Sequence, residues 1–86
     1  MSDLIPVIVL CPGEVLEGEL NTLGIRLDEF SNDSGIEYST LERIINGHQG
    51  ITQAFAVKIS EQLGTSAELW LGLEKAYQDY LKREGK

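Results

Sequence analysis

The chain has 86 residues, with 14 Asp and Glu against 7 Lys and Arg, and a formal net charge of −7. This length holds one modest core and no separate catalytic domain. One Cys and one His exclude a disulfide framework and leave too few ligands for a zinc site. No apolar run approaches the roughly 18 residues of a membrane span, and no basic segment precedes residues 4–10, so we expect a cytoplasmic protein without membrane association.

The charge is unevenly distributed along the chain. Residues 1–42 contain nine acids and one base, Arg26, whereas residues 43–86 contain five acids and six bases. Affinity for DNA rests largely on Lys and Arg that neutralise phosphates. The acidic half therefore disfavours nucleic acid and favours a basic protein partner.

Residues 4–10 are apolar on both faces and rich in β-branched side chains, which is typical of a short strand or an extended arm. Pro6 confines such a strand to a sheet edge. Because no second strand is predicted, the arm would pair with a second copy or a partner through Ile5, Val7 and Val9. The alternative is an arm packed over the helices of its own chain.

Five helices are predicted beyond this arm, from apolar residues at helical spacing. We expect them at about residues 12–23, 27–34, 39–45 and 53–63, followed by one that begins after residue 65 and reaches residue 80. Their ends are marked by glycines, which favour the left-handed backbone conformation found there: Gly24, Gly35, Gly47 and Gly64. The sequence therefore predicts an all-α, five-helix bundle.

Hydroxyl side chains mark the starts of the last three helices. Ser39 and Glu42 have the spacing of a capping box, as do Thr65 and Glu68. Thr52 precedes the fourth helix as a single cap.

The apolar residues also predict which helix faces are buried. The first helix would bury Val15, Leu16, Leu20 and Leu23. The fifth has an apolar and aromatic face wider than one small neighbour would cover, which suggests an interface. This face comprises Leu69, Trp70, Leu73, Ala76, Tyr77 and Tyr80.

No catalytic constellation is recognisable. Cys11 and His48 fall at a strand end and in a turn, and the acids lie on predicted solvent faces. The glycines stand singly rather than in a phosphate-binding loop. We therefore predict neither an enzyme nor a bound metal or cofactor.

The second and third helices, joined by residues 35–38, match the helix-turn-helix pattern. Phe30, Ile36, Leu41 and Ile44 occupy the positions that must be apolar to hold the two helices at a steep angle. Many helical bundles contain a similar pair, so an ordinary bundle remains the alternative from this pattern alone.

Several longer motifs extend the pattern. They are Pro12-Gly13-Glu14-Val15-Leu16, Leu23-Gly24-Ile25, Ser39-Thr40-Leu41-Glu42-Arg43-Ile44-Ile45-Asn46-Gly47, Ile51-Thr52 and Leu63-Gly64-Thr65-Ser66-Ala67-Glu68-Leu69-Trp70-Leu71-Gly72-Leu73. Over about residues 12–80 the chain resembles the HigA-like antitoxins, Xre-type helix-turn-helix proteins also called plasmid-maintenance antidotes or virulence-associated proteins. The Pro-Gly-Glu opening combined with the Trp-containing tail is the more specific part. The resemblance implies a lambda-repressor-like fold over residues 11–82, followed by a basic tail at residues 83–86.

The resemblance implies a homodimer that neutralises a small basic RNase toxin of the RelE/HigB type and represses its own operon. The positions of the family's recognition helix and following turn that face DNA are Tyr38, Ser39, Thr40, Glu42, Arg43, His48 and Gln49. Arg43 and the hydroxyls suit guanine or phosphate contacts. The dimer or toxin interface would comprise Ile5, Val7, Val9, Trp70, Leu73, Tyr77 and Tyr80.

The chain departs from the family in its charge. His48 and Gln49 stand where members commonly carry Lys and Arg, and four acids replace polar or basic residues: Asp28, Glu29, Asp33 and Glu37. Acids release no counterions and repel phosphate, so this charge should impair autorepression, whereas neutralisation of a basic toxin tolerates it or benefits from it. The alternatives are a helix-turn-helix transcriptional regulator without a toxin, or an acidic protein-interaction module that has lost DNA binding.

Overall fold

The computed structural model describes residues 11–84 and consists of five helices over that range. They are α1 (Pro12–Leu23), α2 (Leu27–Ser34), α3 (Tyr38–Ile45), α4 (Gln53–Leu63) and α5 (Ala67–Glu84). The predicted all-α, five-helix fold is confirmed. The predicted arm, with Ile5, Val7 and Val9, lies outside the described residues, as does the end of the basic tail. No helix in the described range is long and apolar enough to cross a membrane.

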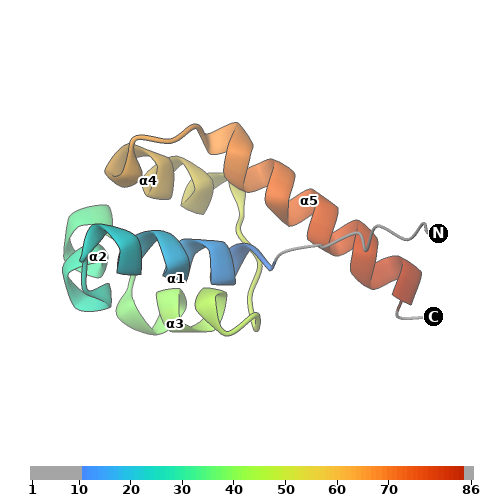
Figure 1. Ribbon diagram of the computed structural model, residues 1–86, viewed down its shortest axis with the longest axis horizontal. Helices are drawn as coiled ribbons and strands as arrows, with labels where there is room; N and C mark the ends of the chain where they lie inside the picture. Colours follow the sequence, from blue (N-terminus) through green and yellow to red (C-terminus); the bar gives the residue numbers. More distant parts are fainter. Residues whose placement is uncertain (1–10, 85–86) are drawn as a thin grey trace.

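The first four helices form a compact body from which α5 extends (Figure 1). Helix α1 packs against α3 and α5, α2 packs against α3 and α4, and α4 packs against α5. One apolar core joins all five helices, and its members are at most 3% exposed: Leu16, Leu20, Phe30, Ile36, Leu41, Ile44, Ile51, Ala56, Ile59 and Trp70. The core residues predicted for the helix-turn-helix are therefore confirmed.

The turn between α2 and α3 is closed by side-chain bonds to the backbone. Gly35 has a φ of 78°. The Ser31 hydroxyl donates to the Ile36 carbonyl oxygen at 2.6 Å, and the Ile36 N–H donates to Ser34 Oγ at 3.2 Å. Ile36 is only 2% exposed, so these bonds satisfy backbone groups that burial would otherwise leave unpaired.

Two of the predicted helix caps are wrong. Helix α3 begins at Tyr38, so Ser39 lies inside the helix, and the N-cap residue Glu37 makes no side-chain cap bond. At α5, Ser66 Oγ rather than Thr65 accepts from the Leu69 N–H, at 3.1 Å. Thr65 Oγ1 instead accepts from the indole N–H of Trp70 at 2.8 Å, because a buried indole needs a hydrogen-bond partner. The cap at Thr52 is confirmed, since its Oγ1 accepts from the Phe55 N–H at 3.3 Å.

One residue predicted to be buried is exposed, and so are two residues of the wide apolar face predicted for the fifth helix. Leu23, in the last turn of α1, is 53% exposed, and Leu69 is 46% exposed. Ala76 is exposed as well. Leu69 precedes the fully buried Trp70, and successive residues of a helix point about 100° apart. The buried side of α5 is therefore narrower than its apolar face, in agreement with the predicted excess of apolar surface.

Gly13 brings α1 close to α3. A Cβ atom there would lie 1.9 Å from the carbonyl oxygen of Ile44 and 2.7 Å from the Cα of Ile45. Only glycine permits this approach. The Pro-Gly-Glu opening therefore has a packing role, whereas Gly24, Gly35, Gly47 and Gly64 have the positive φ predicted for helix ends.

Candidate functional site

The residues predicted to face DNA lie on the exposed side of α3 and in the loop after it. Tyr38, Ser39, Glu42 and Arg43 are exposed, and Thr40 is half-buried. The predicted loop residues His48 and Gln49 are exposed and half-buried, respectively. The opposite side of α3 is buried through Leu41 and Ile44. The first two turns of this helix therefore present polar groups to solvent, as a recognition helix requires.

Two of these residues are joined directly. The Nε–H of Arg43 donates to Gln49 Oε1 at 3.1 Å. The bond holds the guanidinium against the loop, while its two Nη groups remain as donors. A guanidinium held in this way suits bidentate contact with the O6 and N7 atoms of guanine.

The start of α2 carries an ion pair. Arg26 Nη2 lies 2.9 Å from Asp28 Oδ2, and its Nε donates to Asp28 Oδ1 at 3.1 Å. This hydrogen bond is the main cause that lowers the pKa of Asp28 and raises the pKa of Arg26. Asp28 therefore stays ionised and cancels the charge of Arg26. Because both side chains are exposed, the pair adds little stability.

Arg43 is in a different electrostatic position. Within the part of the chain that the structure describes, ion pairs join Arg26 to Asp28 and Lys75 to Asp79, and none involves Arg43. No carboxylate among the described residues therefore offsets its charge on the face of α3. This face also carries Glu42, so Arg43 is a local cation on an acidic surface.

The loop between α3 and α4 is anchored to α5 by Glu74. Its Oε1 accepts from the Ile51 N–H at 3.1 Å, and its Oε2 accepts from Gln78 Nε2 at 2.7 Å. A Cβ atom on Gly50 would lie 2.6 Å from Oε2. Sequence analysis did not identify Glu74 or Gly50. The sequence signal that could have indicated this contact is Gly50, which lies inside a predicted turn rather than at the end of a predicted helix.

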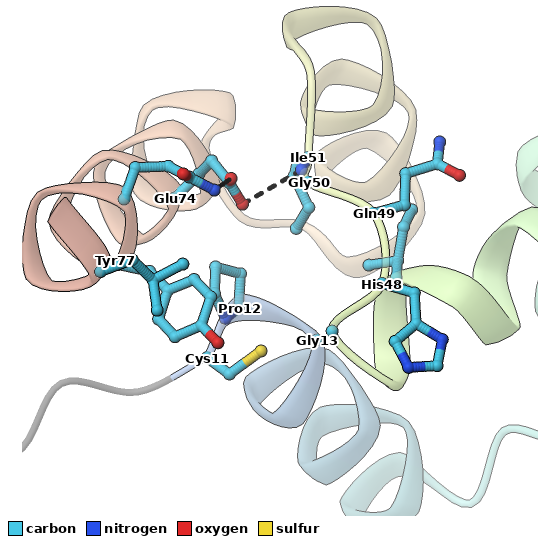
Figure 2. A pocket seen from close by; sticks show the side chains of 13 residues that line it. Cys11, Pro12, Gly13, His48, Gln49, Gly50, Ile51, Glu74 and Tyr77 are labelled. Carbon is cyan, nitrogen blue, oxygen red and sulfur yellow. Dashed lines mark hydrogen bonds between the residues drawn. The ribbon is translucent and has the colours of Figure 1, made fainter. Parts of the chain in front are cut away.

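A cleft of about 160 Å³ lies between this loop, the start of α1 and the middle of α5. Figure 2 shows the phenol of Tyr77 directed toward Cys11 at one side of the cleft and Glu74 at another. The pKa of Tyr77 is raised, first by the negative charge that Cys11 carries when ionised, then by burial, a hydrogen bond with Cys11 and the charges of Glu14 and Glu74. Within the described residues, no cluster of three or more His, Cys, Asp or Glu could hold a metal ion.

The residues predicted for the dimer or toxin interface occupy different environments on α5. Trp70 is 0% exposed and belongs to the core. Leu73, Tyr77 and Tyr80 are half-buried, and Leu81, which was not predicted, is 41% exposed. Apart from the exposed Leu69, the apolar surface of α5 that another molecule could contact therefore runs from Leu73 to Leu81.

Comparison with known proteins identifies the family. A helix-turn-helix family model matches residues 19–70, a range that covers α2 to α4 and includes Trp70. The chain belongs to this helix-turn-helix family. The chain is also similar to a protein of Escherichia coli K12, the uncharacterized HTH-type transcriptional regulator YddM. The two proteins are 33% identical over 66 residues, which are 77% of this chain and 70% of the relative.

Solved structures of antidote proteins share the fold of this helix-turn-helix protein. A candidate antidote of a plasmid maintenance system from Nostoc punctiforme is 29% identical, with a TM-score of 0.87 over 92% of this chain and 87% of that chain. An addiction-module antidote of the HigA family from Coxiella burnetii is 31% identical, with a TM-score of 0.80 over 90% of this chain and 87% of that chain. The resemblance to HigA-like antitoxins is thereby confirmed.

A third helix-turn-helix structure contains DNA. It is the antitoxin HigA of Pseudomonas aeruginosa with the higBA promoter, which is 23% identical, with a TM-score of 0.80 over 91% of this chain and 88% of that chain. At this identity the likeness shows the fold alone.

Proposed function

We propose that this protein is the antitoxin of a type II toxin–antitoxin module, which neutralises a small RNase toxin of the RelE/HigB type and represses its own operon. The carrying observation is the likeness to the HigA-family antidote of C. burnetii, which extends over 90% of the chain at 31% identity. This share extends far beyond the helix-turn-helix formed by α2 and α3.

Operator binding would use the exposed side of α3 and the following loop. The proposed contacts are Tyr38, Ser39, Thr40, Glu42, Arg43, His48 and Gln49. Arg43 would make the central contact, because its charge is not cancelled by a carboxylate among the described residues. The fold shared with the promoter-bound HigA of P. aeruginosa supports this assignment.

Toxin binding and homodimerisation would use the part of α5 from Leu73 onward. Leu73, Tyr77, Tyr80 and Leu81 leave apolar and aromatic surface accessible there. Aromatic side chains are enriched in protein interfaces. The net charge of −7 would attract a basic toxin and accelerate its association.

The toxin proposal is tested by affinity purification of the tagged protein from its native host, with nuclease treatment and mass spectrometry. Recovery of one small basic protein in stoichiometric amount, encoded beside the antitoxin gene, is expected. Nuclease treatment removes proteins bridged by nucleic acid. Recovery of the protein without a stoichiometric partner would overturn toxin neutralisation and favour a regulator without a toxin.

The operator proposal is tested with Arg43→Ala. Affinity for the duplex immediately upstream of the gene should fall by about 1–3 kcal/mol, with a shallower salt dependence. Lys58→Ala is the matched control, since Lys58 is an exposed base on α4, outside the helix-turn-helix. An equal loss in both variants would mean that only overall charge matters.

A second candidate function is an acidic protein-interaction module without DNA binding. It is favoured by the Asp28–Arg26 pair, which leaves the start of α2 without net positive charge. This alternative predicts a stoichiometric protein partner together with no specific affinity for the upstream duplex.

A further inference from the structure

Glu74 connects the partner-facing helix to the loop that carries predicted DNA contacts. It lies in α5 between Leu73 and Lys75, at the point where the helix passes the α3–α4 loop. Its carboxylate accepts from the Ile51 N–H at 3.1 Å. Figure 2 shows this bond spanning from α5 to the loop.

The contact is close and specific. A Cβ atom on Gly50 would lie 2.6 Å from Glu74 Oε2 and 3.2 Å from its Cδ, so the carboxylate rests directly against the backbone of the loop. Gln78, one turn further along α5, donates to the same carboxylate at 2.7 Å. Ile51 itself is 3% exposed. One oxygen of the Glu74 carboxylate therefore accepts a hydrogen bond from the loop and the other accepts one from α5, and together these bonds fix the carboxylate in place.

A second hydrogen bond connects the loop to α3, the predicted recognition helix. Gln49 directly precedes Gly50, and its Oε1 accepts from the Nε–H of Arg43 at 3.1 Å. The backbone position of residues 50 and 51 thus determines where the Gln49 side chain begins. The Gln49 amide in turn orients the guanidinium of Arg43. Three consecutive loop residues join a side chain of α5 to a side chain of α3.

We propose that Glu74 is a positioning residue that holds Arg43 in its DNA-facing orientation through Gln49. This inference rests on the proposed operator function for its consequence, but the contact itself belongs to the free protein. Because Glu74 lies between Leu73 and Tyr77 on α5, a partner that displaces this part of the helix changes the orientation of Arg43. Partner binding and operator affinity are thereby linked.

The charge of Glu74 and its positioning role predict opposite effects on DNA. Removing an acid lowers repulsion of phosphate and should strengthen DNA binding. Removing the acceptor for the Ile51 N–H should release the loop and weaken specific binding. Glu74→Gln removes the charge and keeps a side-chain oxygen for Ile51, whereas Glu74→Ala removes both. The pair of variants therefore separates the two effects.

The first experiment is nuclear magnetic resonance of the free protein. Glu74→Ala should accelerate hydrogen exchange of the Ile51 amide and shift the Nε–Hε resonance of Arg43. Glu74→Gln should leave the Arg43 resonance close to its position in the unsubstituted protein. Lys75→Ala is the matched control, because Lys75 is the next residue of α5 and pairs only with Asp79 within the described residues.

The second experiment measures affinity for the duplex immediately upstream of the gene. Glu74→Ala and Gln49→Ala should each weaken specific binding by about five- to tenfold. Glu74→Gln should bind at least as tightly as the unsubstituted protein. In an Arg43→Ala background, Glu74→Ala should cause no further loss, because both changes act on the same contact.

An Arg43 resonance that does not move in Glu74→Ala would overturn the inference, as would tighter DNA binding by both Glu74 variants. If Glu74→Ala fails to fold, Gln49→Ala keeps the inference testable, because an Arg43 resonance that does not move in that variant would overturn the route through Gln49. Failure of the unsubstituted protein to bind the duplex would overturn the operator proposal alone. The Arg43 resonance would still show whether Glu74 positions that side chain.

Discussion

The two halves of α5 differ in how they relate to the rest of the molecule. In the first half, Trp70 is 0% exposed and its indole N–H is bonded to Thr65. In the second half, Tyr77 and Tyr80 are half-buried and Leu81 is 41% exposed. Figure 1 shows this half extending past the other helices. Trp70 in the first half anchors the helix, whereas the second half has no fully buried side chain of this kind and presents Leu81, so changes at these residues should affect different measurements.

The largest expected effect comes from removing the anchor. Trp70→Ala should lower the free energy of unfolding by about 3–5 kcal/mol, because it leaves a large cavity in the core. Urea unfolding followed by circular dichroism measures this loss. Leu69→Ala is the control on the same turn, since Leu69 is 46% exposed, and it should cost far less. Equal losses would contradict the distinction between an inward and an outward side of this turn.

The next effect isolates the polar part of the anchor. Thr65→Val preserves the shape of the side chain and removes the acceptor of the indole N–H. A buried donor left without a partner costs about 1–3 kcal/mol. Thr65→Ser retains a hydroxyl and should recover most of this stability. Thermal and urea unfolding of the unsubstituted protein and of the two Thr65 variants would measure these changes in stability. An unaltered unfolding midpoint for Thr65→Val would show that water replaces the hydroxyl as the acceptor of the indole N–H.

In the second half of α5, stability and association should separate. Leu81→Ser should change the free energy of unfolding by less than about 0.5 kcal/mol, as is usual for exposed positions. It should nevertheless weaken self-association, measured by sedimentation across a concentration series. Val57→Ser is the control, because Val57 is similarly exposed, at 40%, but lies on α4. Equal self-association of the two variants would show that Leu81 is not part of the interface.

The smallest effect concerns the ionisation of Tyr77. The pKa of Tyr77 is higher in the folded protein than in the unfolded chain. Its contribution to the free energy of unfolding is therefore present below the ordinary tyrosine pKa, near 10. This contribution is lost as the pH rises through the pKa of Tyr77 in the folded protein. The negative charge of ionised Cys11 is the first cause, before burial, the hydrogen bond with Cys11, Glu14 and Glu74. Cys11→Ala should therefore shift the pKa of Tyr77 downward.

Absorbance titration of the tyrosinate, with Tyr77→Phe to assign the transition, would measure this shift. If the transition assigned to Tyr77 does not move in Cys11→Ala, the thiolate is not the cause of the raised pKa.

The sequence predicted what depends on local periodicity. Helical spacing identified the five helices and core residues such as Phe30 and Ile44, because burial on one helix face repeats at a fixed interval. It did not reveal that Thr65 bonds to an indole rather than capping a helix, since both roles suit a hydroxyl at that position. The exposure of Leu69 depends on which neighbours cover α5, and spacing alone does not contain that information.

The candidate site was predicted in part for the same reason. The exposed residues of α3 followed from the helix-turn-helix pattern and the family resemblance. The bonds from Arg43 to Gln49 and from Glu74 to Ile51 connect residues whose proximity depends on tertiary packing. No local sequence signal marks such contacts, and the contact between Tyr77 and Cys11 is of the same kind.

The bonds of Ser31 and Ser34 to Ile36 bear on the thermodynamics of association. They fix the turn between α2 and α3 before any ligand arrives, so docking of these helices requires little loss of backbone conformational entropy. If these helices bind an operator as proposed, the preorganised turn lowers the entropic cost of binding. Adjustment to a mismatched groove would then come mainly from bending of the DNA, which would make the deformability of the bound sequence part of the recognition.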